Sequence, residues 1–167
     1  MLDRYELCCG VSAAFGELSA YLPAYRQAGQ ALVCGERLKS VNRIERPRKW
    51  HPRVFPYDEF QPYCLISEQS FEEIQCWRRG AAGQALLRVE ALDRQRGTND
   101  LQLLYTYLVN ERRAKETGEA LHLHRNSVVY RIEHLREMAA LGDLDDPDVR
   151  AALLMSFRML DLYGSED

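Results

Sequence analysis

One short segment of the chain concentrates side chains that can form hydrogen bonds with DNA. Arginine suits the two acceptors of guanine, asparagine suits the acceptor and donor of adenine, and serine, tyrosine or histidine can bond a base edge or a phosphate. A polar helix face exposed only to water has the same composition, so the residue types alone leave both interpretations open. The candidate DNA-contacting residues are His124, Arg125, Asn126, Ser127, Tyr130, Arg131 and His134.

The apolar residues around this segment predict a helix-turn-helix. Three helices are expected between 99 and 138, with a very short connection before the third. Thr98 or Asn99 caps the first, and the second runs over about 114–121. A recognition helix presents its N-terminal residues to the major groove, and the third helix begins near Arg125. The residues expected to pack inward around the turn and along this helix are Ala120, Leu121, Leu123, Val128, Ile132, Leu135 and Ala139.

The rest of the chain predicts further helices and little strand. Proline at a first helical position, glycine after a helix, and serine or aspartate before one mark the boundaries. The predicted fold class is mainly α, with a C-terminal helix-turn-helix bundle preceded by a small partial α/β segment. In chain order, the other expected elements are a buried strand at 6–11, a helix from Pro23 to a cap at Gly35, a basic loop over 39–53, a strand at Val54–Phe55, a helix over 59–66 capped by Asp58, a helix capped by Ser70, a helix ending before Gly97, and a last helix beginning at Asp146 and Pro147.

Composition and charge set the broad class. Hydrophobic residues make up 46% of the 167 residues and charged residues 28%, which suits a packed core. No stretch approaches 18 consecutive apolar residues, and the first residues lack the pattern of a signal peptide, so we expect a cytoplasmic protein. The net charge of −3 conceals opposed blocks: 36–53 carries seven Lys and Arg against two Glu, whereas 137–167 carries two Arg against eight acids. An acidic protein can still bind nucleic acid if its basic residues share one face.

The five cysteines argue against a disulfide framework. Their number is odd, no C-x-x-C pair occurs, and the adjacent Cys8 and Cys9 cannot easily bridge each other. We therefore expect reduced, mostly buried thiols.

Residues 121–132, which read LHLHRNSVVYRI, resemble the signature of the PucR-type bacterial transcriptional regulators, a family that includes regulators of purine catabolism and of sugar-diacid use. The C-terminal helix-turn-helix of that family reads roughly A-x-x-L-x-x-H-x-N-T-x-x-Y-R-L. The resemblance implies a sequence-specific DNA-binding transcriptional regulator. It places His124, Asn126, Tyr130 and Arg131 on family positions, with Ser127 in place of the usual Thr and Gly118 in place of the usual Ala.

A looser resemblance extends toward the N-terminus. Residues 10–12, 24–32 and 54–60 are similar to the last part of the family's GGDEF-like middle domain. The resemblance implies a partial GGDEF-like α/β segment over 1–68, a helical connector over 69–97 and the PucR-type DNA-binding domain over 98–167. Only the tail of a GGDEF-like domain fits into the first of these. Any effector-sensing region would then lie before it, and the small-molecule effector is unknown.

Enzymatic interpretations find little support. His122 and His124, with His134, could hold a metal, but two histidines in H-x-H spacing lack a third ligand held in place. No cysteine has a base beside it, and no Gly-Gly-Asp/Glu-Glu-Phe string supplies the metal ligands of a nucleotide cyclase. Residues 143–148 lack the glycine and terminal glutamate of an EF-hand and indicate a helix cap instead. We therefore expect no enzyme, no metal and no cofactor.

Two questions stay open at this level. The apolar last helix and the acidic block over 137–167 could serve a protein partner or dimerisation instead of DNA, although ordinary core packing against the helix-turn-helix is the preferred explanation of the apolar stripe. The basic stretch 39–53 could be an exposed loop, a second nucleic-acid contact or a site for an acidic partner. A single helix-turn-helix rarely gives enough specificity, so the expected assembly on DNA is a homodimer on paired half-sites.

Overall fold

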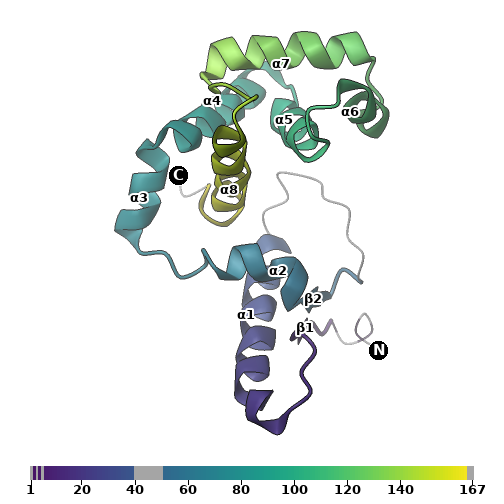
Figure 1. Ribbon diagram of the computed structural model, residues 1–167, viewed down its shortest axis with the longest axis vertical. Helices are drawn as coiled ribbons and strands as arrows, with labels where there is room; N and C mark the ends of the chain where they lie inside the picture. The colour runs from purple at the N-terminus through teal and green to yellow at the C-terminus, as the bar shows by residue number, and fades with distance from the viewer. Residues whose placement is uncertain (1, 3, 5, 40–50, 165–167) are drawn as a thin grey trace. The chain divides into compact units, whose positions relative to one another are not determined.

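The structure is a computed structural model that describes residues 2, 4, 6–39 and 51–164. These residues form two compact units, one containing the described residues up to Gln69 and one beginning at Ser70 (Figure 1). Eight α-helices and two short strands occur among them, which confirms the predicted mainly α fold class. None of these helices is both long enough and apolar enough to cross a bilayer. The three-part division at 68 and 97 and the GGDEF-like assignment remain predictions.

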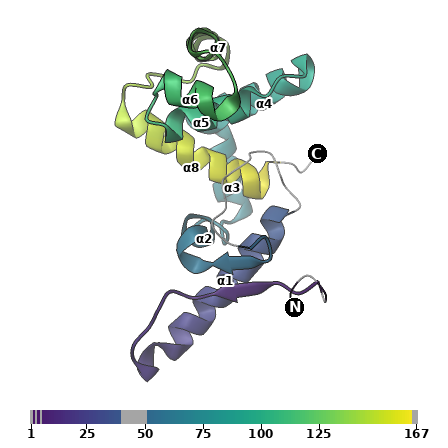
Figure 2. The same cartoon turned by 90° about the vertical axis from the view of Figure 1, so that its right-hand side faces the viewer.

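The first unit is a two-stranded parallel sheet packed against one long helix (Figure 2). Strand β1 pairs with strand β2, with Cys9 opposite Val54 and Val11 opposite Pro56. The rings of Phe55 and Phe60 meet edge to face, with centroids 5.3 Å apart, in the core between the sheet and the helices. The elements are β1 (Cys9–Val11), the 3-10 turn η1 (Leu18–Ala20), α1 (Tyr21–Lys39), β2 (Val54–Pro56) and α2 (Tyr57–Cys64).

The prediction that Gly35 ends a helix is wrong. Helix α1 continues to Lys39, and Gly35 is a buried residue in its interior. A Cβ atom at this position would lie 2.2 Å from two ring carbons of Phe55. The glycine therefore makes room for the central aromatic residue of β2 instead of terminating the helix.

Three smaller expectations for this unit also change. The strand predicted over 6–11 as buried is only β1, and Cys9 and Val11 are exposed, because Gly10 between them faces α1 and successive strand side chains point to opposite faces. The helix predicted to start after Asp58 begins at Tyr57, with the extended Pro56 at its N-cap and Asp58 in its first turn, where a carboxylate favours the helix dipole. The predicted basic loop over 39–53 lies, from 40 to 50, outside the described residues.

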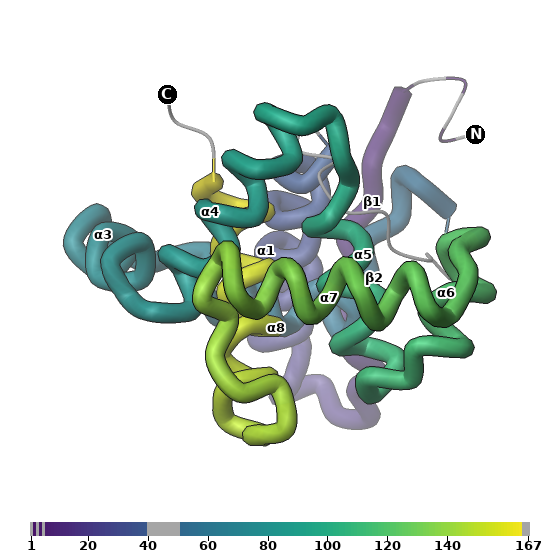
Figure 3. Tube along the Cα trace, turned by 90° about the horizontal axis from the view of Figure 1, so that it is seen from above, coloured from purple at the N-terminus to yellow at the C-terminus, as the bar shows by residue number. Residues whose placement is uncertain are grey.

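The second unit is a bundle of helices around one apolar core. Helix α7 packs against α4, α5 and α6 (Figure 3), and α8 packs against α3, α4 and α5. The core includes the fully buried Leu86 of α4, Leu104 of α5, Val128 of α7 and Phe157 of α8. The elements are α3 (Phe71–Arg79), α4 (Ala81–Arg96), α5 (Asp100–Val109), α6 (Ala114–Leu121), α7 (Arg125–Ala139) and α8 (Pro147–Tyr163).

The helix ends of this unit follow local signals, with one exception. Ser70 and Glu73 form a reciprocal capping box on α3, Gly97 ends α4 with a φ of 64°, and Asp146 caps α8 ahead of Pro147. All three confirm the predicted boundaries. The exception is α5, where the Asn99 side chain makes no cap hydrogen bond. The carboxylate of Asp93 from α4 caps the helix instead, by accepting the backbone N–H groups of Asp100 and Leu101.

Candidate nucleic-acid interface

The turn between α6 and α7 is tight because Gly118 lets the chain fold back closely. The backbone N–H of Leu123 donates to the Gly118 carbonyl oxygen at 2.8 Å. A Cβ atom at 118 would lie 2.5 Å from the Leu123 carbonyl oxygen. His122 ends α6 in the left-handed conformation, with a φ of 55°. Glycine at 118, in place of the usual alanine of the resembling family, therefore suits this connection.

His124 fixes the first turn of α7. Its backbone is extended, and its Nδ1 atom accepts the backbone N–H of Asn126 at 3.2 Å. This bond satisfies one of the N–H groups that a helix start leaves without an intrahelical partner. The same bond holds the imidazole ring in one orientation just before the predicted contact residues.

The inner face of α7 is locked into the core. Val128, Ile132, Leu135 and Ala139 are all buried, which confirms the predicted stripe. Leu121 and Leu123 are half-buried against the same core. Ala120, however, is exposed, so its predicted inward packing is wrong. The buried residues of α6 are Thr117 and Gly118, and the Thr117 hydroxyl donates to the Arg113 carbonyl at 2.8 Å.

The outer face of α7 displays polar side chains in its first two turns. Arg125, Asn126 and Ser127 are exposed, and Tyr130 is 73% exposed. The ring of Tyr130 lies parallel to that of His134, with an interplanar angle of 4° and centroids 6.4 Å apart. These donors stand on a helix whose opposite face cannot move without disturbing the core, which is the arrangement that base recognition requires.

The second half of the same face is acidic. Glu133 and Glu137 are exposed, and Glu133 pairs with Arg136 at 3.2 Å. Carboxylates repel DNA phosphates, so Glu133 and Glu137 make this half of the face less suited to DNA than the first two turns. At the flank, His134 Nε2 lies 3.1 Å from Arg96 Nη1 of α4, a cationic neighbour that sequence reasoning missed.

Arg131 faces a different direction from the other predicted contact residues. Its Nε donates to Asp100 Oδ1 at 2.9 Å, and its Nη2 donates to the same oxygen. Asp100 is buried, and it belongs to α5. No sequence pattern links residues 31 positions apart, which explains why this partner was not anticipated.

The histidines, acids and cysteines that could serve an enzyme do not form a metal site in the described part of the chain. Among residues 2, 4, 6–39 and 51–164, the structure shows no set of three or more His, Cys, Asp or Glu arranged for a metal. Asp146 accepts the backbone N–H of Asp148 at 2.8 Å, which is the cap predicted for that acidic stretch. All five cysteines are free, but only Cys34 and Cys64 are buried, so the expectation of mostly buried thiols is wrong. Burial, followed by the neighbouring Cys34, raises the pKa of the Cys64 thiol to about 12, which keeps it protonated and unreactive at neutral pH.

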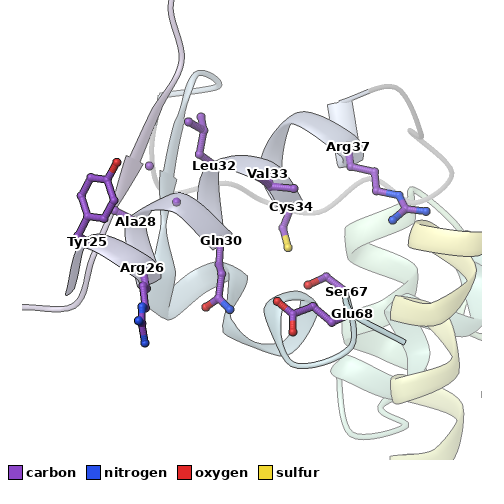
Figure 4. A pocket seen from close by; sticks show the side chains of 12 residues that line it. Tyr25, Arg26, Ala28, Gln30, Leu32, Val33, Cys34, Arg37, Ser67 and Glu68 are labelled. Atoms are coloured by element: carbon purple, nitrogen blue, oxygen red, sulfur yellow. The ribbon is translucent and has the colours of Figure 1, made fainter. Parts of the chain in front are cut away.

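A groove of about 670 Å³ in the first unit is the competing site. It follows α1, and Figure 4 shows Arg26, Gln30 and Arg37 spread along that helix, with Ser67 and Glu68 on the segment after α2. Arg26 and Arg37 lie at opposite ends and do not converge on one point with Glu68 and Ser67 (Figure 4). A small-molecule site needs a few convergent polar groups, which this groove lacks.

Comparison with known proteins finds a family model for part of the chain and one similar regulator. Residues 101–159 match the family model of the PucR C-terminal helix-turn-helix domain, which confirms the resemblance for that region. Over 75 residues, the chain is 32% identical to the proline-responsive transcriptional activator PutR of Bacillus subtilis strain 168. That alignment covers 45% of this chain and only 18% of the relative. No solved structure matches the chain.

Proposed function

We propose that this chain is a sequence-specific DNA-binding regulator of transcription that places the N-terminal half of α7 in the major groove. The observation that carries the proposal is the position of Arg125, Asn126 and Ser127. They are exposed side by side at the start of a helix whose other face is buried in the core. This helix lies within the region that matches the helix-turn-helix family model.

Each residue in the first two turns has a chemically distinct role in this proposal. Arg125 suits the O6 and N7 acceptors of guanine, and Asn126 suits the N6 and N7 atoms of adenine. The hydroxyl of Ser127 suits a phosphate oxygen. His124 holds this turn in place through its cap. Tyr130 and His134 extend the polar face toward the flanking backbone.

The regulator is proposed to act by binding alone, without catalysis. Two copies would bind paired half-sites, because one short recognition helix contacts too few base pairs for genomic specificity. The Bacillus subtilis relative is named as a proline-responsive activator. For this chain, the proposal assigns no effector and no direction of regulation.

Selection from a randomised duplex pool, followed by fluorescence-anisotropy titration, tests the proposal. The full chain should enrich one sequence and bind it more tightly than a shuffled duplex. Asn126→Ala should lose about 1–3 kcal/mol of specific binding, as expected for one bidentate base contact. Gln61→Ala, which removes an exposed amide from α2 in the other unit, is the matched control and should bind as the wild type does.

Three outcomes would overturn the proposal. The first is a chain that enriches no sequence. The second is an Asn126→Ala variant that loses affinity equally for every duplex, which would make Asn126 a backbone contact. The third is DNA-independent self-association through the second unit, detected by mass measurement with no DNA binding at low salt, which would favour a protein-interaction module.

A further inference from the structure

A line of hydrogen bonds to carboxylates runs from α4 through α5 to α7. It begins at Asp93, near the end of α4, whose Oδ1 accepts the backbone N–H of Asp100 at 2.7 Å. The other oxygen of Asp93 accepts the backbone N–H of Leu101 at 2.9 Å. The Thr98 hydroxyl also donates to Asp93 Oδ1, at 2.6 Å. Asp93 therefore fixes the start of α5 and, with it, the backbone of Asp100.

Asp100 continues the line to α7. Its Oδ1 accepts two N–H groups of Arg131, from Nε and Nη2. The side chain of Asp100 is only 11% exposed, and that of Arg131 is 31% exposed. Burying a carboxylate away from water costs free energy unless a charged partner compensates it. Breaking the pair would therefore leave the Asp100 carboxylate as an uncompensated, nearly buried charge. Two donors of the Arg131 guanidinium are thereby directed at α5.

The Asp100–Arg131 pair constrains the rotation of α7, which the apolar core does not. The apolar stripe of α7 holds the helix against its neighbours, but apolar burial is non-directional and tolerates small rotations. A hydrogen-bonded arginine–carboxylate pair has fixed geometry. Arg131 is the next residue after Tyr130, on the side of α7 that faces α5. A constraint at this position therefore limits rotation of α7 about its own axis.

We propose that Asp100 is a positioning residue for DNA recognition: by holding Arg131, it sets the direction in which Asn126 and Tyr130 face the groove. The inference rests on the proposed function. Asp93 and Asp100 both precede residue 101, where the match to the family model begins. The orientation of the recognition helix is thus set by residues outside the matched region.

The proposal differs measurably from a direct DNA contact by Arg131. A phosphate contact would lower the slope of log affinity against log salt by about 0.9 when it is lost. A base contact would relax specificity at a single base pair. A positioning role lowers specificity at every base pair that α7 reads, and leaves the non-specific affinity and its salt slope unchanged.

The test uses the full chain with Asp100→Asn, Arg131→Gln and the double variant. Binding is measured across a salt series, on the duplex that the wild type selects from a randomised pool and on a shuffled duplex. Each single variant should weaken specific binding about tenfold, and the double variant should lose no more than either single one, since coupled residues are non-additive. Asp58→Asn, which alters an exposed aspartate in the first turn of α2, is the matched control and should bind as the wild type does.

A second variant covers the case in which Asp100→Asn does not fold, as judged by circular dichroism. Arg131→Lys keeps the positive charge but cannot reproduce the Nε and Nη2 pair, so it should show the same loss of specificity at an unchanged salt slope. The proposal is overturned by additive losses, by a salt slope that falls by about one in Arg131→Gln, or by wild-type specificity in a folded Asp100→Asn or Arg131→Lys variant. If the wild type selects no sequence, the proposed function fails and the inference fails with it. Wild-type selection with an unaffected Asp100→Asn variant overturns the inference alone.

Discussion

In the second unit, six helices enclose an apolar core, whereas in the first unit one long helix lies against two short strands, and more of the large exposed apolar side chains belong to the first unit. Leu18 is 91% exposed and Val33 is 66% exposed in the first unit. The exposed face of α7 in the second unit is instead mostly polar. A closed core makes α7 a rigid support for polar side chains, and this rigidity is what base recognition needs. Specific DNA recognition is therefore expected of the second unit and not of the first.

The largest expected effect is the destabilisation of the second unit by Phe157→Ala, which removes a large side chain from its apolar core. Phe157 is fully buried, and its ring meets that of Tyr105 edge to face at 5.4 Å. Removing it should lower the free energy of unfolding of this unit by about 3–5 kcal/mol. Hydrogen exchange should show lost protection in α4, α5 and α8 with unchanged protection in α1. Equal loss in α1 would show that the two units unfold together and would remove the basis of the comparison.

A smaller loss of stability is expected in the first unit, where α1 packs on β2. Gly35→Ala places a methyl group against the Phe55 ring and should destabilise this unit by about 1–3 kcal/mol, because an overpacked core must shift. Gly29→Ala on the same helix is the matched control, since its Cβ would meet nothing within 4 Å. It should stabilise α1 by up to about 1 kcal/mol through helix propensity. Chemical denaturation of both variants checks the pair, and a stabilised Gly35→Ala would contradict the packing of β2 on α1.

A smaller effect compares two exposed tyrosines. Tyr130 of α7 is 73% exposed and Tyr25 of α1 is 67% exposed, so truncating either should change the free energy of unfolding little. Tyr130→Ala should nevertheless weaken binding to the selected duplex by about 0.5–1.5 kcal/mol, the net value of one hydrogen bond. Tyr25→Ala should leave binding unchanged. Equal losses in anisotropy titrations would mean that both units contact DNA.

The smallest effect concerns two surface glutamates. Hydrogen bonds from the Ser70 backbone and hydroxyl lower the pKa of Glu73 in the second unit. A hydrogen bond with the Cys8 thiol, followed by one with Lys39, lowers the pKa of Glu36 in the first. Since both folded pKa values lie below the unfolded ones, each contribution to stability is present above the unfolded pKa and is lost as the pH falls through the folded pKa.

Raising the salt concentration distinguishes the cause of the lowered pKa at Glu36 from the cause at Glu73. Glu36 lies 2.8 Å from the Lys39 ammonium, and salt screens that exposed pair. NMR titration of the carboxyl carbons should show the pKa of Glu36 rising part of the way toward its usual value in high salt, because salt screens the Lys39 charge but not the Cys8 hydrogen bond, while the pKa of Glu73 stays low. A shift of equal size at both residues would contradict the capping-box explanation for Glu73.

Local signals predicted the parts of the fold that depend on neighbouring residues. The spacing of apolar residues gave the second helix of the helix-turn-helix over 114–121, as observed, and placed the start of the third at Arg125. Ser70 and Asp146 cap the helices that follow them because their partners lie within three residues. The buried stripe of α7 followed from its 3.6-residue period.

Features that depend on distant partners were not predictable from one sequence. Asp93 caps α5 from the preceding helix, and Asp100 meets Arg131 only after three helices have packed together. Glycine commonly follows the end of a helix, but Gly35 lies inside α1 because the Phe55 ring of β2 needs the space of its missing side chain. The position of Arg131 in the motif therefore places it among the DNA-facing residues, whereas its guanidinium donates to Asp100 in the structure.

The most direct test of the central claim is an NMR titration of the full chain with the duplex that it selects from a randomised pool. We expect the backbone amide shifts to concentrate at residues 124–134 of the second unit, with the shuffled duplex giving smaller changes there. The amides of α1, including those around Arg26, should not move. Shifts centred on α1, or none at Arg125, Asn126 and Ser127 while the duplex is bound, would contradict the claim that the start of α7 recognises DNA.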